Sequence, residues 1–216
     1  MTAVMRQDFA DSSLSAPLYD YRTLEIFPHG MRRIFASAAE TDFISAYLQL
    51  FSSFGVTVSR FTVAVSAIIG TLTSIPALKT KTCIVMLLDG AASTSLLLVN
   101  GRYRYSNRAR FFNEPNSPEF VGEIERTIHG ILQFHASEKI TSPVTDVYLG
   151  GFSSGLAKEV MELGESSFHI PTVLLPDSPS ILFSAVSGNG AALCDYVCPV
   201  GALVNGRVGK YDKKAD

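Results

Sequence analysis

A single aspartate stands where an apolar run meets a turn of small residues. Residues 84–88 are apolar, Asp89 ends the run, and Gly90, Ser93 and Thr94 follow before a second apolar run begins at residue 96. Glycine lets a backbone come close to a ligand, successive amides in such a turn can cradle an anion, and a hydroxyl can donate to it. The carboxylate could equally cap its own turn, and the residues leave both alternatives open.

A glycine doublet is the second candidate for chemistry. Gly150 and Gly151 follow a strand predicted over residues 145–149, and Ser153 or Ser154 can cap the helix after them. The start of a helix favours an anion or a polar edge, and glycine lets a flat ring lie against the backbone there. A strand-to-helix turn requires glycine for its own geometry too, so a purely structural role is the alternative.

The other candidates are weaker. Arginines alternate with tyrosines over residues 102–110, which suits a nucleic-acid stripe, but a solvated strand face is favoured at a net charge of −2. Glu123 and Arg126 could reach a ribose or face solvent. Cys194 and Cys198 are one helical turn apart in apolar surroundings, which favours a place in the core over a metal site.

The composition indicates a compact globular protein. Of 216 residues, 47% are hydrophobic and 18% charged, and the net charge gives no general attraction to nucleic acid or anionic membrane. Three cysteines and the absence of an apolar leader at the start indicate a reducing compartment. Residues 61–78 carry no charge, but they are too polar to predict a membrane span.

The elements that must position these residues begin with a small α/β unit. We predict a loose arm or strand edge over residues 1–17, a hairpin of strands 19–26 and 32–38, and a helix over 41–53 that Thr41 or Asp42 caps. The apolar residues of that helix share one face at helical spacing (Phe43, Ile44, Tyr47, Leu48 and Phe51). Gly55 ends it, a strand is predicted over 56–65, and a further helix runs from residue 67 until Pro76.

The second part of the chain is predicted to carry a sheet with helices. Strands over 84–88, 96–99 and 102–105 are joined by the small turn and by Asn100-Gly101, with a loop from residue 108. Ser117 caps a helix to about residue 136, and a strand, a helix closed by Gly164 and a strand over 171–175 follow. Helices are expected over 181–186 and 191–204, and a frayed tail over 210–216.

This order of elements resembles the PilM and FtsA branch of the actin-like ATPases. Residues 88–102 resemble the phosphate-2 hairpin, 123–128 the helix after it, 147–154 the adenosine motif and 200–203 the closing helix. Upstream, residues 33–40, the helix from Thr41 and residues 54–58 resemble subdomain 1C, the insert that distinguishes this branch from actin. The resemblance implies a partial α/β, actin-like (ribonuclease H-like) fold, divided into a 1C-like unit (1–80), the second actin-like domain (81–209) and a flexible tail (210–216).

The resemblance also implies a nucleotide site with three departures. It implies ATP and magnesium at Asp89, Gly90, Ser93, Thr94, Gly150, Gly151 and Ser153, with Asp89 holding the metal through water. The Asp-x-Gly loop with which family members begin is not found, Gly90 and Ala91 replace the usual aliphatic residue and glycine, and the interval from Asp89 to Gly150 is short. We therefore expect no ATP turnover by this chain alone, because hydrolysis needs phosphate clamps from both domains.

The function that the resemblance implies is a scaffold. It would be a cytoplasmic component of a type IV pilus or related secretion assembly complex, peripheral at the inner face of the cell membrane. Its partner would be the short cytoplasmic tail of a PilN-like protein, bound near the helix over 41–53. The chain would also self-associate, and it would neither bind nucleic acid nor span the membrane. The alternatives are a nucleotide-dependent actin-like switch and an FtsA-like division protein, although the tail lacks an amphipathic membrane helix.

Overall fold

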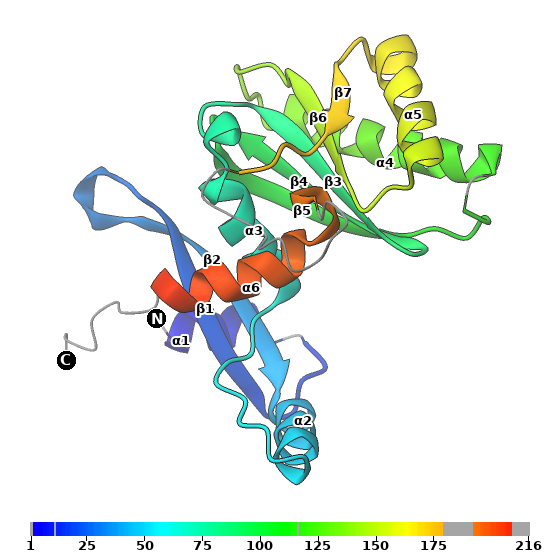
Figure 1. The fold of residues 1–216 in the computed structure, drawn as a ribbon. Coiled ribbons are helices and arrows are strands. Elements are labelled where there is room, and N and C mark those ends of the chain that lie inside the picture. Colours follow the sequence, from blue (N-terminus) through cyan, green and yellow to red (C-terminus); the bar gives the residue numbers. More distant parts are fainter. Residues whose placement is uncertain (1, 11, 116, 179–191, 209–216) are drawn as a thin grey trace. The chain divides into compact units, whose positions relative to one another are not determined.

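The chain folds into two compact units, residues 1–66 and 67–216, and each is described by itself. The computed structural model describes residues 2–10, 12–115, 117–178 and 192–208 (Figure 1). The helix and the final tail predicted over 181–186 and 210–216 lie outside these residues. The domain boundaries implied by the resemblance stay a prediction.

The first unit is built on one β-hairpin. After α1 (Thr2–Asp8), β1 (Pro17–Ile26) pairs antiparallel with β2 (Arg32–Glu40), and a 3-10 turn, η1 (Pro28–Gly30), joins them. His29 and Gly30 both take positive φ, at 72° and 79°, so the predicted turn at Pro28 is confirmed. Helix α2 (Thr41–Ser53) follows directly, and Gly55 ends it at φ 71°, as predicted.

Several predictions for this unit are wrong. The start of the chain is helical rather than a loose arm, and residues 56–63 form no strand, with α3 beginning at Ala64 instead. The residue that caps α2 is Glu40, whose side chain makes no cap hydrogen bond, because it accepts from Ser15 and Ala16 instead. No residue of α2 is buried, so the apolar face of this helix is left uncovered by the described residues.

The second unit is a five-stranded mixed sheet with helices. It contains most of α3 (Ala64–Ser74), a turn η2 (Pro76–Leu78) and the strands β3 (Cys83–Asp89), β4 (Ala92–Val99) and β5 (Arg102–Arg110). Then come α4 (Pro118–Ser137), β6 (Asp146–Gly150), α5 (Ser154–Leu163), a π-helical turn η3 (Gly164–Phe168), β7 (Thr172–Leu174), η4 (Leu193–Asp195) and α6 (Val197–Val208). The strand order is β5-β4-β3-β6-β7, with β3, β6 and β7 parallel and β4 antiparallel to both of its neighbours.

Helices α4 and α5 cover one face of this sheet (Figure 1). The core between them contains side chains that alternate along β3 and β6, together with the buried stripes of both helices (Ile84, Met86, Val147, Leu149, Phe120, Ile124, Ile128, Ile131, Leu156 and Val160). This alternation places the odd-numbered residues of β3 on the opposite face. The carboxylate of Asp89 therefore projects from the face that α4 and α5 do not cover.

Local sequence signals in this unit are confirmed. Asn100 and Gly101 take φ 51° and 73°, as a type I′ turn requires. Ser117 accepts from the Phe120 amide at 3.1 Å, and Ser153 accepts from the Leu156 amide at 3.4 Å, so both serines cap their helices. The third strand reaches Arg110 rather than ending at Tyr105, because β4 continues to pair with it as far as Ala92. Within the described residues, no helix is long and apolar enough to cross a bilayer.

Candidate functional site

The Asp89 turn and the glycine doublet lie together at one end of the sheet. Strands β3 and β6 are parallel neighbours, and Leu87 is in register with Gly150. Asp89 ends β3 two residues later, and Gly151 follows β6. The structure therefore brings together the two segments that the sequence singled out.

Asp89 is exposed at the start of a tight hairpin turn. Asp89 pairs with Ala92, so Gly90 and Ala91 form the two-residue loop, and Gly90 has φ 58°, as a type II′ turn requires at its first position. A Cβ added at Gly90 would meet nothing within 4 Å. The backbone of this turn is thus accessible, as an anion site would require.

The two hydroxyl residues of the turn point to opposite faces. Thr94 is in register with Leu87, on the Asp89 face, whereas Ser93 is in register with Leu88, on the face of α4 and α5. Ser93 is 1% exposed and its hydroxyl oxygen has no hydrogen-bond partner in the part of the chain that the structure describes. The structure therefore brings Thr94 toward Asp89 and separates Ser93 from it.

The space beside the glycine doublet is occupied by other parts of the chain. A Cβ at Gly150 would lie 2.7 Å from the carbonyl oxygen of Cys194, and one at Gly151 would overlap the carbonyl oxygen of Leu88. Gly151 also has φ 75°, which favours glycine. Both glycines are thus required by the packing of the chain, and the Ser153 hydroxyl is occupied in capping α5.

The electrostatics place Asp89 near α6. Burial raises the pKa of the Cys198 thiol, and the charge of Asp89 raises it further. Burial likewise raises the pKa of Cys194, and that of Cys83 to about 12. All three thiols are therefore protonated and unreactive near neutral pH.

The described residues offer few ligands for a metal near the Asp89 turn. The described residues contain no group of three or more His, Cys, Asp or Glu side chains that could hold a metal ion. Asp89 could meet magnesium only as a single carboxylate, through water. Glu123, which the sequence placed near a ribose, accepts from the amide of Phe112 at 3.0 Å and so holds the loop before α4.

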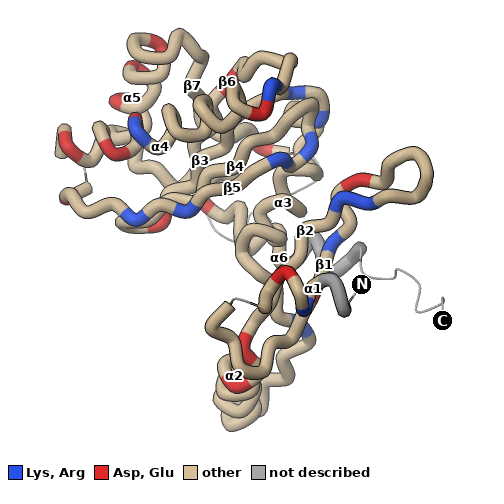
Figure 2. The backbone as a smooth tube through the Cα atoms, turned by 180° about the vertical axis from the view of Figure 1, so that it is seen from behind, with Lys and Arg blue, Asp and Glu red and all other residues tan. Residues whose placement is uncertain are grey.

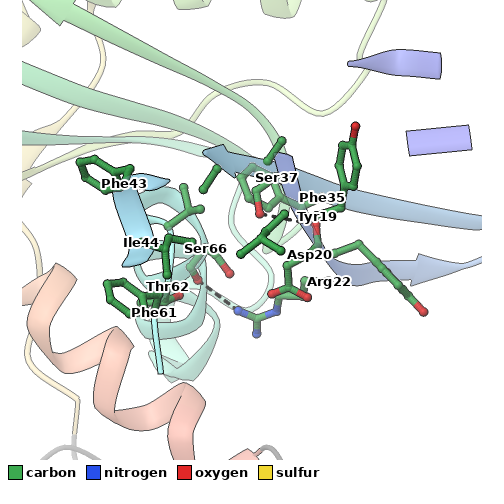
Figure 3. Close-up of a pocket in the computed structure, with 15 residues that line it drawn as sticks. Tyr19, Asp20, Arg22, Phe35, Ser37, Phe43, Ile44, Phe61, Thr62 and Ser66 are labelled. Carbon is green, nitrogen blue, oxygen red and sulfur yellow. Dashed lines mark hydrogen bonds between the residues drawn. The ribbon is translucent and has the colours of Figure 1, made fainter. Parts of the chain in front are cut away.

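The first unit contains a groove that the sequence did not predict. It has a volume of about 290 Å³ and lies between β1, β2, the start of α2 and residues 61–66. Figure 3 shows Phe43, Ile44 and Phe61 grouped on one side and Tyr19, Asp20 and Phe35 on the other. The walls are mainly apolar, and several of the apolar side chains remain exposed to solvent (Leu18, Tyr21, Phe43, Phe61 and Val63).

A polar contact joins two of the segments that line the groove. Arg22 donates to the carbonyl oxygen of Ser66 at 3.2 Å, which ties β1 to the segment before α3. Burial lowers the pKa of Arg22, but a guanidinium remains charged at neutral pH. A concave apolar surface with a few placed polar groups is the usual form of a binding site.

Two sequence signals for this groove existed. The helical spacing of Phe43, Ile44 and Tyr47 identifies an apolar face and does not say what covers it. The start of the uncharged run from residue 61 was interpreted as part of a buried strand. In the structure both segments line the groove or lie beside it, with Phe43 58% and Phe61 39% exposed.

Comparisons with known proteins identify the fold. No protein-family profile matches the sequence, and no curated protein matches it either. A solved structure of the PilM-PilN type IV pilus biogenesis complex contains a similar chain: the TM-score is 0.64 at 14% identity, over 95% of this chain and 70% of that one. A Bacteroides thetaiotaomicron protein with an actin-like ATPase fold and unknown function matches over 80% of this chain and 60% of its own, with a TM-score of 0.48 at 12% identity.

The chain has, in part, an actin-like α/β fold, as the sequence predicted. The particular structure that it resembles in fold is a chain of the PilM-PilN type IV pilus biogenesis complex. At 14% identity this likeness concerns the fold alone.

Proposed function

We propose that this chain is a cytoplasmic scaffold component of a type IV pilus or related secretion assembly complex. It would lie at the inner face of the membrane and bind the cytoplasmic tail of a PilN-like membrane protein. The fold likeness to a chain from a PilM-PilN complex supports this proposal. The observation that carries it is the apolar groove of the first unit, which lies beside α2, where the resemblance implies that the tail binds.

The groove suits a short peptide better than a rigid domain. Its walls come from a hairpin, a helix and residues 61–66, and several of its apolar side chains are exposed, so the groove is open to solvent. A tail that inserts apolar side chains between Phe35, Phe43 and Phe61 would bury surface that is now in contact with water. Polar groups of the tail could meet Asp20 and Ser37 at the groove wall.

Truncation of Phe61 tests the proposal. Phe61→Ala removes one wall of the groove without touching the β1–β2 pairing. We expect it to weaken binding of a PilN-like tail peptide about tenfold, equivalent to about 1.4 kcal/mol. The measurement is fluorescence anisotropy with a labelled peptide.

Phe112→Ala is the matched control. Phe112 is 88% exposed in the second unit and does not line the groove, so the same truncation there should leave peptide affinity unchanged. Circular dichroism of both variants verifies that each is folded. Absence of binding by the wild-type chain, or equal weakening by both variants, would count against the groove.

A second candidate function is nucleotide binding without turnover. It is favoured by the accessible Asp89 turn beside the start of α5, although the glycine doublet is filled by Cys194 and Leu88. A ligand at one hundred times its Kd stabilises a protein by about 2.7 kcal/mol. Mg-ATP should therefore raise the Tm of the wild-type chain and not that of Asp89→Asn. If millimolar ATP leaves the wild-type Tm unchanged, nucleotide binding is excluded and the scaffold function is the one candidate that is left.

A further inference from the structure

Strand β5 forms one edge of the five-stranded sheet. In the order β5-β4-β3-β6-β7 it pairs with β4 alone, along its length from Arg102 to Arg110. It carries four arginines and no acidic residue, and Figure 2 shows basic positions along this strand. The edge of a sheet offers a row of main-chain groups with which another strand can pair.

The direction of these main-chain groups follows from one hydrogen bond. The amide of Phe111 donates to the carbonyl oxygen of Ala91 at 2.8 Å, so these two residues bond to each other where β4 and β5 meet. In an antiparallel ladder, bonded pairs alternate with pairs that do not bond to each other. Every second residue therefore directs its amide and carbonyl away from β4 (Ser106, Arg108 and Arg110). Among the described residues, none outside β4 forms a main-chain hydrogen bond with these three.

Two arginines at this edge are exposed and make no ion pair with a described residue. Arg108 and Arg110 project on the same face as Asp89, because the β4 residues opposite them do, and alternation places them about 7 Å apart. Arg104, by contrast, forms an ion pair with Glu138. Asp89 lies in the same row as Arg110 but two strands away, about 10 Å, which is too far for an ion pair.

The side chains of β5 decide between possible occupants of the edge. A second β5 is disfavoured, because it would set four arginines beside four others. Single-stranded nucleic acid needs free rings on which bases can stack. Tyr105 is instead stacked on Phe134, with ring centroids 4.1 Å apart, and the half-buried Tyr103 shares a hydrogen bond of 2.9 Å with the Ser106 hydroxyl. A lipid surface requires exposed apolar side chains, and β5, all of which the structure describes, has no large one.

We propose that the β5 edge docks an extended acidic peptide segment of a protein partner, which adds a sixth strand to the sheet. Its main chain would bond to the amides and carbonyls of Ser106, Arg108 and Arg110. Carboxylates at every second position of the segment would lie beside the two exposed arginines. In this mode of recognition, main-chain hydrogen bonds supply affinity and alternate side chains supply specificity.

Fluorescence anisotropy with a labelled peptide of alternating glutamate and threonine tests the charge requirement. We expect the full chain to bind it with a Kd below about 1 mM, and the affinity should fall as salt is added. Arg108→Gln combined with Arg110→Gln should weaken binding about tenfold, because two exposed ion pairs are lost. Arg126→Gln is the matched control, since Arg126 is an exposed arginine of α4, and it should change the affinity less than about twofold.

Hydrogen exchange followed by NMR tests the main-chain pairing. The peptide should slow exchange of the outward amides of Ser106 and Arg108, whereas those of Asn107 and Ala109, which already bond to β4, should be unchanged. The same peptide methylated on every amide nitrogen keeps its charge but has no donors, so it should bind at least about tenfold more weakly.

Several results would overturn the proposal. They are no binding at about 1 mM peptide, equal weakening by Arg126→Gln, undiminished binding of the methylated peptide, and tighter binding of oligothymidine or of anionic vesicles. Circular dichroism verifies that each variant is folded. The β5 edge belongs to the second unit and the groove to the first, so Phe61→Ala should leave binding at β5 unchanged. The two proposals can therefore fail separately.

Discussion

Gly201 of α6 is a position where a single methyl group should lower the stability of the second unit. A Cβ there would overlap the carbonyl oxygen of Ala67 in α3 and lie 2.7 Å from the hydroxyl oxygen of Thr71. Carbon atoms in ordinary contact are about 3.5 Å or more from their neighbours. Because one of the atoms met is backbone, the methyl group can fit only if α3 and α6 move apart.

The cost of Gly201→Ala follows from three terms. Overpacking a tight contact costs about 1–3 kcal/mol. Separation of the helices would also weaken the hydrogen bond that Thr71 donates to the Val197 carbonyl at 2.7 Å, worth about 1 kcal/mol. Alanine returns about 1 kcal/mol through its higher helix propensity. The net loss is about 1–3 kcal/mol, and Tm should fall by about 3–10 °C for a chain of this size.

Gly130→Ala is the matched control for this prediction. Gly130 lies inside α4, and a Cβ there would meet nothing within 4 Å. The same substitution should therefore stabilise the protein by about 0.5–1 kcal/mol and raise Tm by about 1–4 °C. Thermal unfolding followed by circular dichroism measures both. A Gly201→Ala protein that melts at or above the wild-type temperature would refute the close approach of α3 and α6.

Two further predictions concern buried and charged groups of the second unit. The hydroxyl oxygen of Ser95 is buried without a hydrogen-bond partner among the described residues, so Ser95→Ala should raise the free energy of unfolding in urea by about 1 kcal/mol. Ser117→Ala removes a helix cap and should lower the same free energy by about 1 kcal/mol. Burial alone would raise the pKa of Asp146, but hydrogen bonds from Lys81, at 2.7 Å, and from Thr145 lower it below its ordinary value. The stability that this carboxylate contributes is present above its unfolded pKa of about 3.9 and is lost as pH falls through the lowered folded value. Urea unfolding between pH 2 and 6 should accordingly show a shallower acid loss for Asp146→Asn than for the wild type.

The features that could be predicted from the sequence are those that a few neighbouring residues determine. The turn at Asn100-Gly101 needs positive φ at both residues, and the cap at Ser117 needs one hydroxyl and one amide three residues away. The meeting of Asp89 with Gly151 could be anticipated too, since parallel neighbouring strands end at the same edge of a sheet. Even the separation of Ser93 from Thr94 follows from strand alternation once Asp89 is chosen as the reference.

The features that could not be predicted depend on distant partners. Residues 56–63 have the composition of a strand, but a strand requires a neighbour to pair with, and the hairpin β1–β2 forms a sheet of its own. The close contact of Gly150 with Cys194 joins positions that no local pattern relates. The apolar face of α2 has the same periodicity as that of α4, yet α4 buries Phe120, Ile124, Ile128 and Ile131 and α2 buries none of its residues.

This difference between the two helices explains where recognition is expected in the molecule. Phe43 of α2 lines the groove and is 58% exposed, so a tail peptide bound there would bury apolar surface that the chain itself leaves in contact with water. The buried stripe of α4 offers no such surface, because the sheet already covers it.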